Sequence, residues 1–179
     1  EAAQSFLIVA FPADELKILD YNRVVRDING LGIDDFLARV GEAFDVVETD
    51  GQARPRKMHE FGMYLDGRWY RLTPKRPPAA DAPALERLDV RVLSDLLLEP
   101  MLGIGDPRTD PRIDFVGGIR GLDELERRVD SGEMAVAFAL FATGIDDLMA
   151  VADAGDVMPP KSTWFEPKLA DGLISYPLS

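Results

Sequence analysis

The sequence predicts a single α+β domain over residues 1–179, with a mixed β-sheet, hairpins and about four helices. Three observations predict this class. Apolar runs of strand length alternate along the chain with segments of helical periodicity. Asp66-Gly67 lies between alternating hydrophobic residues, which is a strong hairpin signal. The length of 179 residues, 46% of them hydrophobic, is enough for one ample core.

The first half of the chain is expected to form strands, one helix and one hairpin. Lys17 to Val25 alternates between apolar and polar residues, as in a strand or strand-loop that exposes Tyr21-Asn22-Arg23. The aromatic residues of the hairpin are expected to pack rather than stack on bases. The expected elements are strands at 5–11 and 17–25, a helix at 33–43, a strand at 44–49 and a hairpin at 61–72.

The second half is expected to alternate between helices and strands. A helix over 85–102 is predicted to end at Glu99-Pro100, and the acids of 105–114 are expected to hold turns neutralised by Arg108 and Arg112. Further elements are expected as strands at 113–116 and 134–141, helices at 122–129 and 145–152, and a hairpin of 163–168 with 173–176 around Asp171-Gly172. The strands at 113 and 134 are predicted to run parallel across a crossover.

Composition excludes several classes of protein. Without cysteine the chain has no disulfide framework and no thiolate nucleophile. A formal net charge of −12 would repel a polyanion, which disfavours nucleic acid as a partner. The sequence has no apolar run of membrane-spanning length and no signal peptide, so we expect a cytoplasmic protein without membrane contact.

Candidate catalytic and metal-binding groups are few. His59 is the only histidine and follows a polar loop, so we expect it at the surface, with no histidine dyad completed within this chain. Asp20, Asp89 and Asp114 are conceivable Mg²⁺ ligands, although no spacing distinguishes them from other acids. The sequence alone leaves the catalytic residues and the metal requirement open.

Candidate anion donors gather in the C-terminal segment. Pro159 and Pro160 stiffen an arm that delivers Lys161, Ser162 and Thr163 to one place. A movable ammonium beside two hydroxyl groups suits a phosphate or a carboxylate, and Lys168 follows shortly after. The alternative is a Pro-Pro turn that simply leads into an edge hairpin.

Two other segments carry candidate donors. Arg23, with Asn22 beside it, offers a planar guanidinium to an anion; the alternative is a surface arginine paired with a nearby acid. Gly117 and Gly118 precede Arg120 and a predicted helix, a layout that exposes backbone N–H groups to an anion. Acidic residues in the first turn of that helix would partly oppose such an anion.

Several strings resemble the prokaryotic family DUF1015. They are Leu16–Val25, Asn29–Leu31, Leu88–Val90, Glu99-Pro100, Ile113–Gly118, Ala152–Gly155 and Met158–Leu169, followed by Gly172-Leu173. The strings occur in the order of the family and extend along nearly the whole chain. The chain resembles the C-terminal half of that family, so we expect an N-terminal half, with a His-His motif, to be absent here.

The resemblance implies a function for the complete protein. The family has been linked to ParB-like proteins and, through that fold, to free-serine kinases, which is an analogy between folds. It implies a phosphotransferase or phosphatase for O-phosphoserine or a similar phosphorylated metabolite, using Mg²⁺ and ADP or ATP. This chain would bind substrate and phosphate, and its own N-terminal half would be its partner. The alternative implied by the same likeness is a non-catalytic ParB-like regulatory or nucleotide-sensing module.

Overall fold

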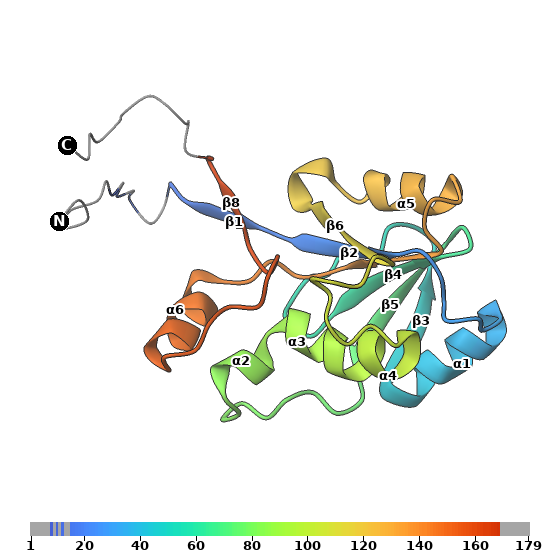
Figure 1. Ribbon diagram of the computed structural model, residues 1–179, viewed down its shortest axis with the longest axis horizontal. Helices are drawn as coiled ribbons and strands as arrows, with labels where there is room; N and C mark the ends of the chain where they lie inside the picture. Colours follow the sequence, from blue (N-terminus) through green and yellow to red (C-terminus); the bar gives the residue numbers. More distant parts are fainter. Residues whose placement is uncertain (1–7, 9, 11, 13–14, 169–179) are drawn as a thin grey trace.

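The computed structural model describes residues 8, 10, 12 and 15–168 and confirms the α+β class (Figure 1). The strands are β1 (Lys17–Leu19), β2 (Tyr21–Val25), β3 (Phe44–Thr49), β4 (Phe61–Leu65), β5 (Arg68–Pro74), β6 (Ile113–Gly117), β7 (Val136–Ala139) and β8 (Trp164–Glu166). The α-helices are α1 (Ile33–Ala43), α2 (Ala84–Arg87), α3 (Asp89–Leu93), α4 (Glu99–Leu102), α5 (Asp123–Asp130) and α6 (Ile145–Asp153). A π-helical segment, η1 (Ser94–Leu98), and a 3₁₀ turn, η2 (Gly118–Arg120), complete the described elements.

The main sheet has the strand order β3-β5-β4-β7-β2-β6, and neighbouring strands in it are antiparallel. The crossover expected between the strands at 113 and 134 is present, because α5 connects β6 to β7. These two strands both pair antiparallel with β2 and therefore run in the same direction. They are not neighbours, however, since β2 lies between them. The strand that carries Arg23 is therefore an internal strand of the sheet.

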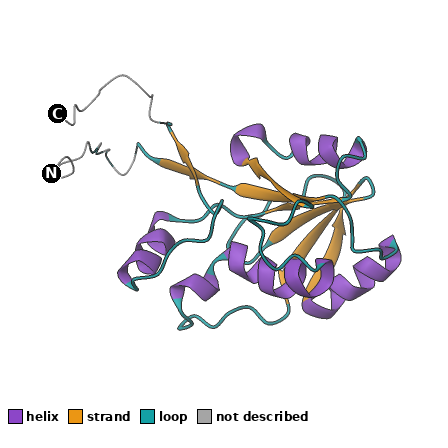
Figure 2. Cartoon of the chain, viewed as in Figure 1, coloured by secondary structure: helices purple, strands orange, loops and turns teal. Residues whose placement is uncertain are grey.

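Helices cover both faces of the main sheet (Figures 1 and 2). One face packs against α1, α3 and α4, and its core includes Phe36, Phe61 and Leu97. The other face packs against α5 through a smaller cluster that includes Leu125 and Ala137. Alternate residues of β2 enter the two cores, with Val25 on the first face and Val24 on the second.

The helix predicted at residues 33–43 and the hairpin predicted at 61–72 are both confirmed. Helix α1 buries Phe36 and Val40 on the apolar stripe that its spacing indicates. Strands β4 and β5 pair on either side of Asp66-Gly67. Both turn residues have positive φ, 49° and 74°, as a two-residue hairpin turn of type I′ requires.

The segment predicted as one helix over 85–102 is divided into α2, α3, η1 and α4. The backbone N–H of Glu99 bonds the carbonyl of Ser94, five residues earlier, which widens the helix into a π turn just before Pro100. Pro100 did not end the helix as predicted, because it occupies the first turn of α4, where no backbone donor is needed. The helix ends instead at Gly103, whose φ of 69° is left-handed.

A second sheet, which we call the ribbon, joins β1 to β8. The two strands pair antiparallel with Lys17 opposite Glu166 and Leu19 opposite Trp164. The predicted strand around residue 165 is therefore confirmed, with β1 as a partner that the sequence did not indicate. Residues 173–176, which were expected to pair with it, and most of the strand expected at 5–11 lie outside the described residues. Because Asp20 alone separates β1 from β2, the ribbon continues directly into the main sheet.

Candidate anion-binding site

Arg23 lies in the interior, not at the surface as predicted. It occupies the middle of β2 directly opposite Phe115 of β6, and its guanidinium carbon lies 4.8 Å from the centre of the Phe115 ring. Only 4% of Arg23 is exposed, and neighbouring Asn22 is fully buried. The prediction of an exposed Tyr21-Asn22-Arg23 segment was wrong because β2 has a strand on each side and packing on each face.

The charge of Arg23 has no acidic partner among the described residues, so the alternative of a surface arginine paired with a nearby acid is not what the structure shows. One guanidinium nitrogen, Nη1, donates to the carbonyl of Tyr21 at 2.5 Å. Burial lowers the pKa of Arg23 to about 10, because the charged form has lost its hydration without gaining a carboxylate. A guanidinium has five N–H donors, so most of its capacity to bind an anion is unused.

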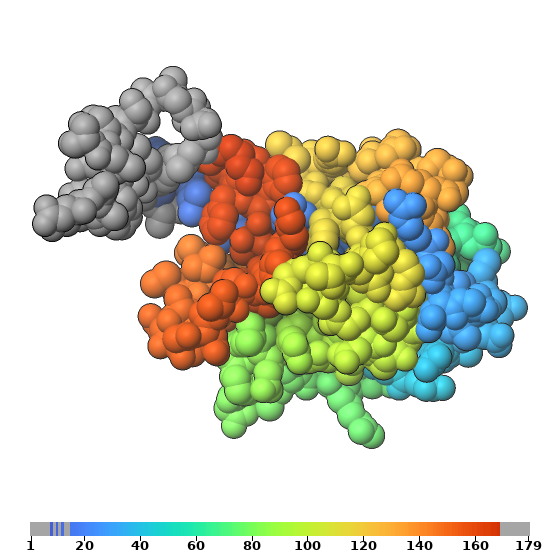
Figure 3. Space-filling model, viewed as in Figure 1, coloured from blue at the N-terminus to red at the C-terminus, as the bar shows by residue number. Residues whose placement is uncertain are grey.

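A pocket of about 430 Å³ lies beside Arg23, and we call it the arginine pocket. Its lining includes the helical residues Leu85, Val90 and Leu98, together with Pro159 and Pro160 of the arm. In Figure 3 the orange-red surface of the C-terminal segment meets the yellow-green surface of residues around 100–108. The proline-stiffened arm and Arg23 therefore line the same pocket, although they are distant in sequence.

Other polar residues line the arginine pocket that sequence reasoning did not select. Arg91 is paired with Asp95 at 2.8 Å, and Arg108 is paired with Asp106 at 2.9 Å, as its neighbouring acid had suggested. Ser94 enters from the first residue of η1. The sequence signal that could have found Ser94 is weak, because a π turn leaves no characteristic residue pattern. The two ion pairs leave Arg23 as the uncompensated charge of the described lining.

The arm holds its shape through internal hydrogen bonds. The Ser162 hydroxyl donates to the carbonyl of Pro159 at 2.7 Å, and the Ser162 carbonyl accepts from Thr143 at 3.1 Å. Ser162 is 5% exposed, so its hydroxyl shapes the turn. Lys161 is exposed and has a left-handed φ of 57°, while Thr163 is half-buried just before β8.

Three of the predicted basic residues are linked by aromatic rings. Lys161 Nζ lies 5.8 Å from the ring centre of Tyr21, which contacts the rings of both Phe115 and Trp164. Lys168 Nζ lies 4.4 Å from the Trp164 ring, and Arg23 lies over Phe115. Arg23, Lys161 and Lys168 thus share one aromatic cluster, defined by these three rings. Of the three basic residues, Arg23 alone lines the arginine pocket.

Gly117, Gly118 and Asn22 hold the backbone around this cluster. A Cβ on Gly117 would lie 2.3 Å from the Trp164 ring, so Trp164 packs directly on the strand. The N–H of Gly118 is donated to the carbonyl of Asp20 at 2.8 Å and is not available to an anion in this arrangement. The Asn22 side chain accepts from the N–H of Leu140 at 3.0 Å and donates to Asp20 at 2.6 Å.

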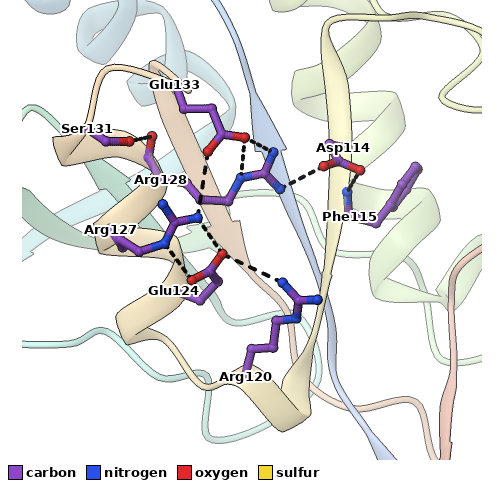
Figure 4. Close-up of polar contacts among 8 residues, drawn as sticks. All are labelled: Asp114, Phe115, Arg120, Glu124, Arg127, Arg128, Ser131 and Glu133. Atoms are coloured by element: carbon purple, nitrogen blue, oxygen red, sulfur yellow. Dashed lines mark hydrogen bonds and ion pairs between the residues drawn. The ribbon is translucent and has the colours of Figure 1, made fainter.

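Arg120 lies apart from the aromatic cluster, in a network of charges along α5 (Figure 4). It is exposed, and its Nη1 lies 3.8 Å from Glu124, which also binds Arg127. In the same network Arg128 bridges Glu133 and Asp114 and so fastens α5 to β6. The structure therefore brings Arg120 together with acids, and not with Arg23 or Lys161.

His59 lies beside the buried acid Asp89 and is only partly exposed, whereas a surface position was predicted. Its side chain is 19% exposed, and its ring Nε2 lies 3.9 Å from Asp89 and 2.8 Å from the carbonyl of Arg87. Its backbone N–H donates to Asp89 at 2.8 Å. Burial raises the pKa of Asp89 to about 6. The contact between His59 and Asp89 arises from the tertiary fold, and no spacing in the sequence indicated that the two residues would meet.

The three acids considered as Mg²⁺ ligands are separated. Asp20 binds Asn22, Asp89 binds His59, and Asp114 binds Arg128, each in a different part of the fold. Within the described residues, no three His, Asp or Glu side chains gather closely enough to hold a metal ion. The described part of the chain therefore offers no cluster of ligands that fits Mg²⁺. No described helix is both long and apolar enough to cross a membrane.

Solved structures with a similar fold are known. A free serine kinase in complex with AMP matches with a TM-score of 0.51 and 16% identity, over 89% of this chain and 57% of that one. A conserved hypothetical protein from Pyrococcus furiosus matches with a TM-score of 0.51 and 15% identity, over 89% of this chain and 60% of that one. At these identities the likeness shows the fold. The chain spans less than two thirds of the length of either structure.

A comparison with curated proteins found no match. A family model, described as "Protein of unknown function (DUF1015)", matches residues 1–91, which is just over half of the 179 residues. The string Met158–Leu169 lies beyond the matched range. The resemblance seen in the sequence is confirmed, and the chain belongs to the family DUF1015.

Proposed function

We propose that this chain is the substrate- and phosphate-binding part of a cytoplasmic phosphotransferase or phosphatase for O-phosphoserine or a similar small phosphorylated metabolite. The observation that carries the proposal is Arg23, a buried guanidinium without an acidic partner among the described residues, beside a pocket of about 430 Å³. That volume suits a small metabolite. An anionic ligand would supply the charge that the protein leaves unbalanced at Arg23.

The basic residues around the pocket support a role in binding. Lys161 immediately follows Pro160, which lines the pocket, and it shares the aromatic cluster with Arg23 and Lys168. Phosphoryl transfer depends mostly on positioning and on stabilising charge, and arginine and lysine side chains provide both. The hydroxyl of Thr163 and the backbone around Asn22, Gly117 and Gly118 would support these contacts. Arg120 is paired with Glu124, so a contact between Arg120 and the ligand would require η2 to move on binding.

The remaining chemistry is assigned to the other half of the full-length protein. One solved neighbour is a free serine kinase that binds AMP, and this chain spans 57% of it. By analogy, we propose that ADP or ATP, Mg²⁺ and the acid-base groups bind to an N-terminal half of the full-length protein. In the transfer, the phosphoryl group would pass between the serine hydroxyl oxygen and ADP or water.

The experiment is an activity assay of the full-length protein. Phosphate release from O-phosphoserine, and phosphoryl exchange with ADP, are measured with and without Mg²⁺. We expect Arg23→Ala and Lys161→Ala to lower kcat/KM by at least about tenfold, because each removes a charged contact to the ligand. Arg127→Ala is the matched control, since this exposed arginine is paired with Glu124 on α5.

Two results would argue against the enzyme. Equal activity of the wild type, Arg23→Ala and Lys161→Ala would remove this half from the chemistry. Binding of a nucleotide or phosphorylated metabolite without turnover under any of these conditions would instead favour the regulatory, ParB-like alternative.

A further inference from the structure

The arginine pocket and the arm offer two cationic positions that differ in burial. Arg23 lies at the sheet, 4% exposed, with its guanidinium over Phe115. Lys161 is exposed on the arm, next in sequence to the pocket-lining Pro160. The rings of Phe115 and Tyr21 separate the two cations. A small ligand that binds at Arg23 and extends past the pocket along the arm would therefore meet a buried fork of donors at one end and the solvated ammonium of Lys161 at the other.

The charge balance of the pocket limits what can bind at Arg23. Asp95 neutralises Arg91, and Asp106 neutralises Arg108, so the described lining has one unbalanced positive charge. A carboxylate, with a single negative charge, would balance it. A phosphate monoester carries close to two negative charges at neutral pH, and at Arg23 it would leave a buried negative charge unpaired.

The shapes of the two cations point in the same direction. Guanidinium is planar and matches the two oxygens of a carboxylate with parallel hydrogen bonds. An ammonium on a flexible stem is a movable point charge, and it suits a phosphoryl group that stays partly in water. Ser94, at the start of η1, adds a hydroxyl to the pocket, and apolar side chains such as Leu98 surround it. A π turn in a helix is itself frequent at functional sites.

We infer that the ligand binds with two heads, its carboxylate at Arg23 inside the arginine pocket and its phosphoryl group at Lys161 on the rim. The phosphoryl part of this inference rests on the proposed function. The carboxylate part rests on the geometry and charge of the pocket alone. The substrate class is then a small molecule that carries both groups.

The test compares two ligands that differ in one group. O-phosphoserine has a carboxylate and O-phosphoethanolamine lacks it, while both carry the same ammonium and phosphate. Binding to the full-length protein is measured by calorimetry without nucleotide. We expect the wild type to prefer O-phosphoserine by at least about tenfold, because a bidentate charged contact is lost with the carboxylate.

The variants separate the two heads. We expect Arg23→Met to bind the two ligands equally, and Lys161→Met to weaken both while keeping the preference. Arg127→Met, which removes an exposed arginine of α5, should behave as the wild type. In the unaltered protein, the NMR signal of the Arg23 side-chain N–H should shift with O-phosphoserine and not with O-phosphoethanolamine, so the test does not depend on a variant that folds.

The inference is overturned if Arg23→Met keeps the preference, if Lys161→Met removes it, or if the wild type binds neither ligand. Its failure can be told apart from failure of the proposed function. A carboxylate preference that depends on Arg23, in a protein that neither releases nor transfers phosphate, refutes the enzyme and retains the two-headed site. Turnover of O-phosphoserine without a carboxylate preference refutes the two-headed site and retains the enzyme.

Discussion

Arg23 is held in the interior at a cost in stability, because its buried charge has one hydrogen bond to Tyr21, a contact with Phe115 and no carboxylate partner among the described residues. A cost of this kind is typical of binding sites, where the ligand supplies the missing partner. Methionine would fill much of the same volume without the charge.

We predict that Arg23→Met raises the free energy of unfolding by about 1 kcal/mol, because an apolar side chain avoids the cost of burying an unpaired charge. Urea denaturation of both proteins without ligand measures the difference. A large loss of stability in the variant would show instead that Arg23 is a structural residue, which would weaken the case for the anion site.

The raised pKa of Asp89 leads us to predict that the stability of the protein depends on pH. Burial raises its pKa in the folded protein from 3.8 to about 6, so between these values the folded state binds a proton that the unfolded state has released. The contribution of Asp89 to the free energy of unfolding is therefore fully present below about pH 4 and is lost as the pH rises to about 6. We expect Asp89→Asn, which does not titrate, to gain roughly 3 kcal/mol relative to the wild type over that range.

Urea denaturation of both proteins between pH 4 and 7 checks this expectation, and the difference between them cancels the other titrations. A difference that stays constant with pH would mean that Asp89 is ionised throughout, held by His59 and the neighbouring backbone donors.

At the scale of elements, the contact between β6 and β8 sets the position of the arm. Gly117 lacks a side chain, and the Trp164 ring occupies the space that a Cβ would need. Trp164 also contacts Tyr21 and pairs with Leu19 in the ribbon. This packing keeps the arm beside β2, where Pro159 and Pro160 can line the arginine pocket.

We predict that Gly117→Ala lowers the free energy of unfolding by about 1–3 kcal/mol, because the added methyl group overlaps the Trp164 ring. Ligand affinity should fall with it as the arm shifts. Gly51→Ala is the matched control, since a Cβ at Gly51 meets no atom within 4 Å and its φ is not left-handed. Thermal denaturation and calorimetry measure the two effects, and equal stability of the two variants would contradict this account.

Local elements could be predicted from the sequence because their signals are local. Helix α1 follows from its apolar spacing, and the β4–β5 hairpin follows from Asp66-Gly67. The π turn at Ser94 could not be predicted, because it depends on how the helix packs before Pro100. Alternation along β2 places Arg23 on the same face as Val25, so its burial could have been inferred once β2 was known to be internal.

The candidate site was predictable only in part, because its partners come from distant segments. Proline and lysine in the arm indicated an anion donor, and the structure does bring the arm to Arg23. The contact of β1 with β8 and the His59–Asp89 pair depend on the tertiary fold and have no sequence pattern. Arg120 was chosen from a glycine-rich turn, and the acids of α5 surround it instead.

Across the whole molecule, arginine–carboxylate pairs lower the pKa values of several acids. Glu60 is the most buried case, because Arg56 and Arg71 both bind its carboxylate. Asp110 and Glu124 are lowered in the same way by Arg112 and Arg127. Because the pKa of each of these carboxyl groups is lower in the folded state, the unfolded state binds more protons in acid. The stabilisation from these ion pairs is therefore present above the ordinary carboxyl pKa and is lost as the pH falls below it.

We predict that the protein loses stability steeply as the pH falls below about 4, through the lowered pKa values of these acids. Urea denaturation from pH 6 to pH 2 measures the effect. Glu60→Gln should be less stable at pH 6 and less sensitive to acid than the wild type. Glu86→Gln, at an acid of α2 with no ion pair among the described residues, should keep the full acid sensitivity; an equal response of both variants would contradict the assignment.

The antiparallel ribbon has a mechanical consequence. Lys17 and Glu166 form its outer pair, so the chain segments that leave it depart from the same end. Tension applied between those segments would unzip the residue pairs one after another and would peel the arm away before the main sheet bears load. Lys161 would then move away from Arg23 while β2 keeps its place. A force on the ribbon would therefore separate the two cations without unfolding the domain.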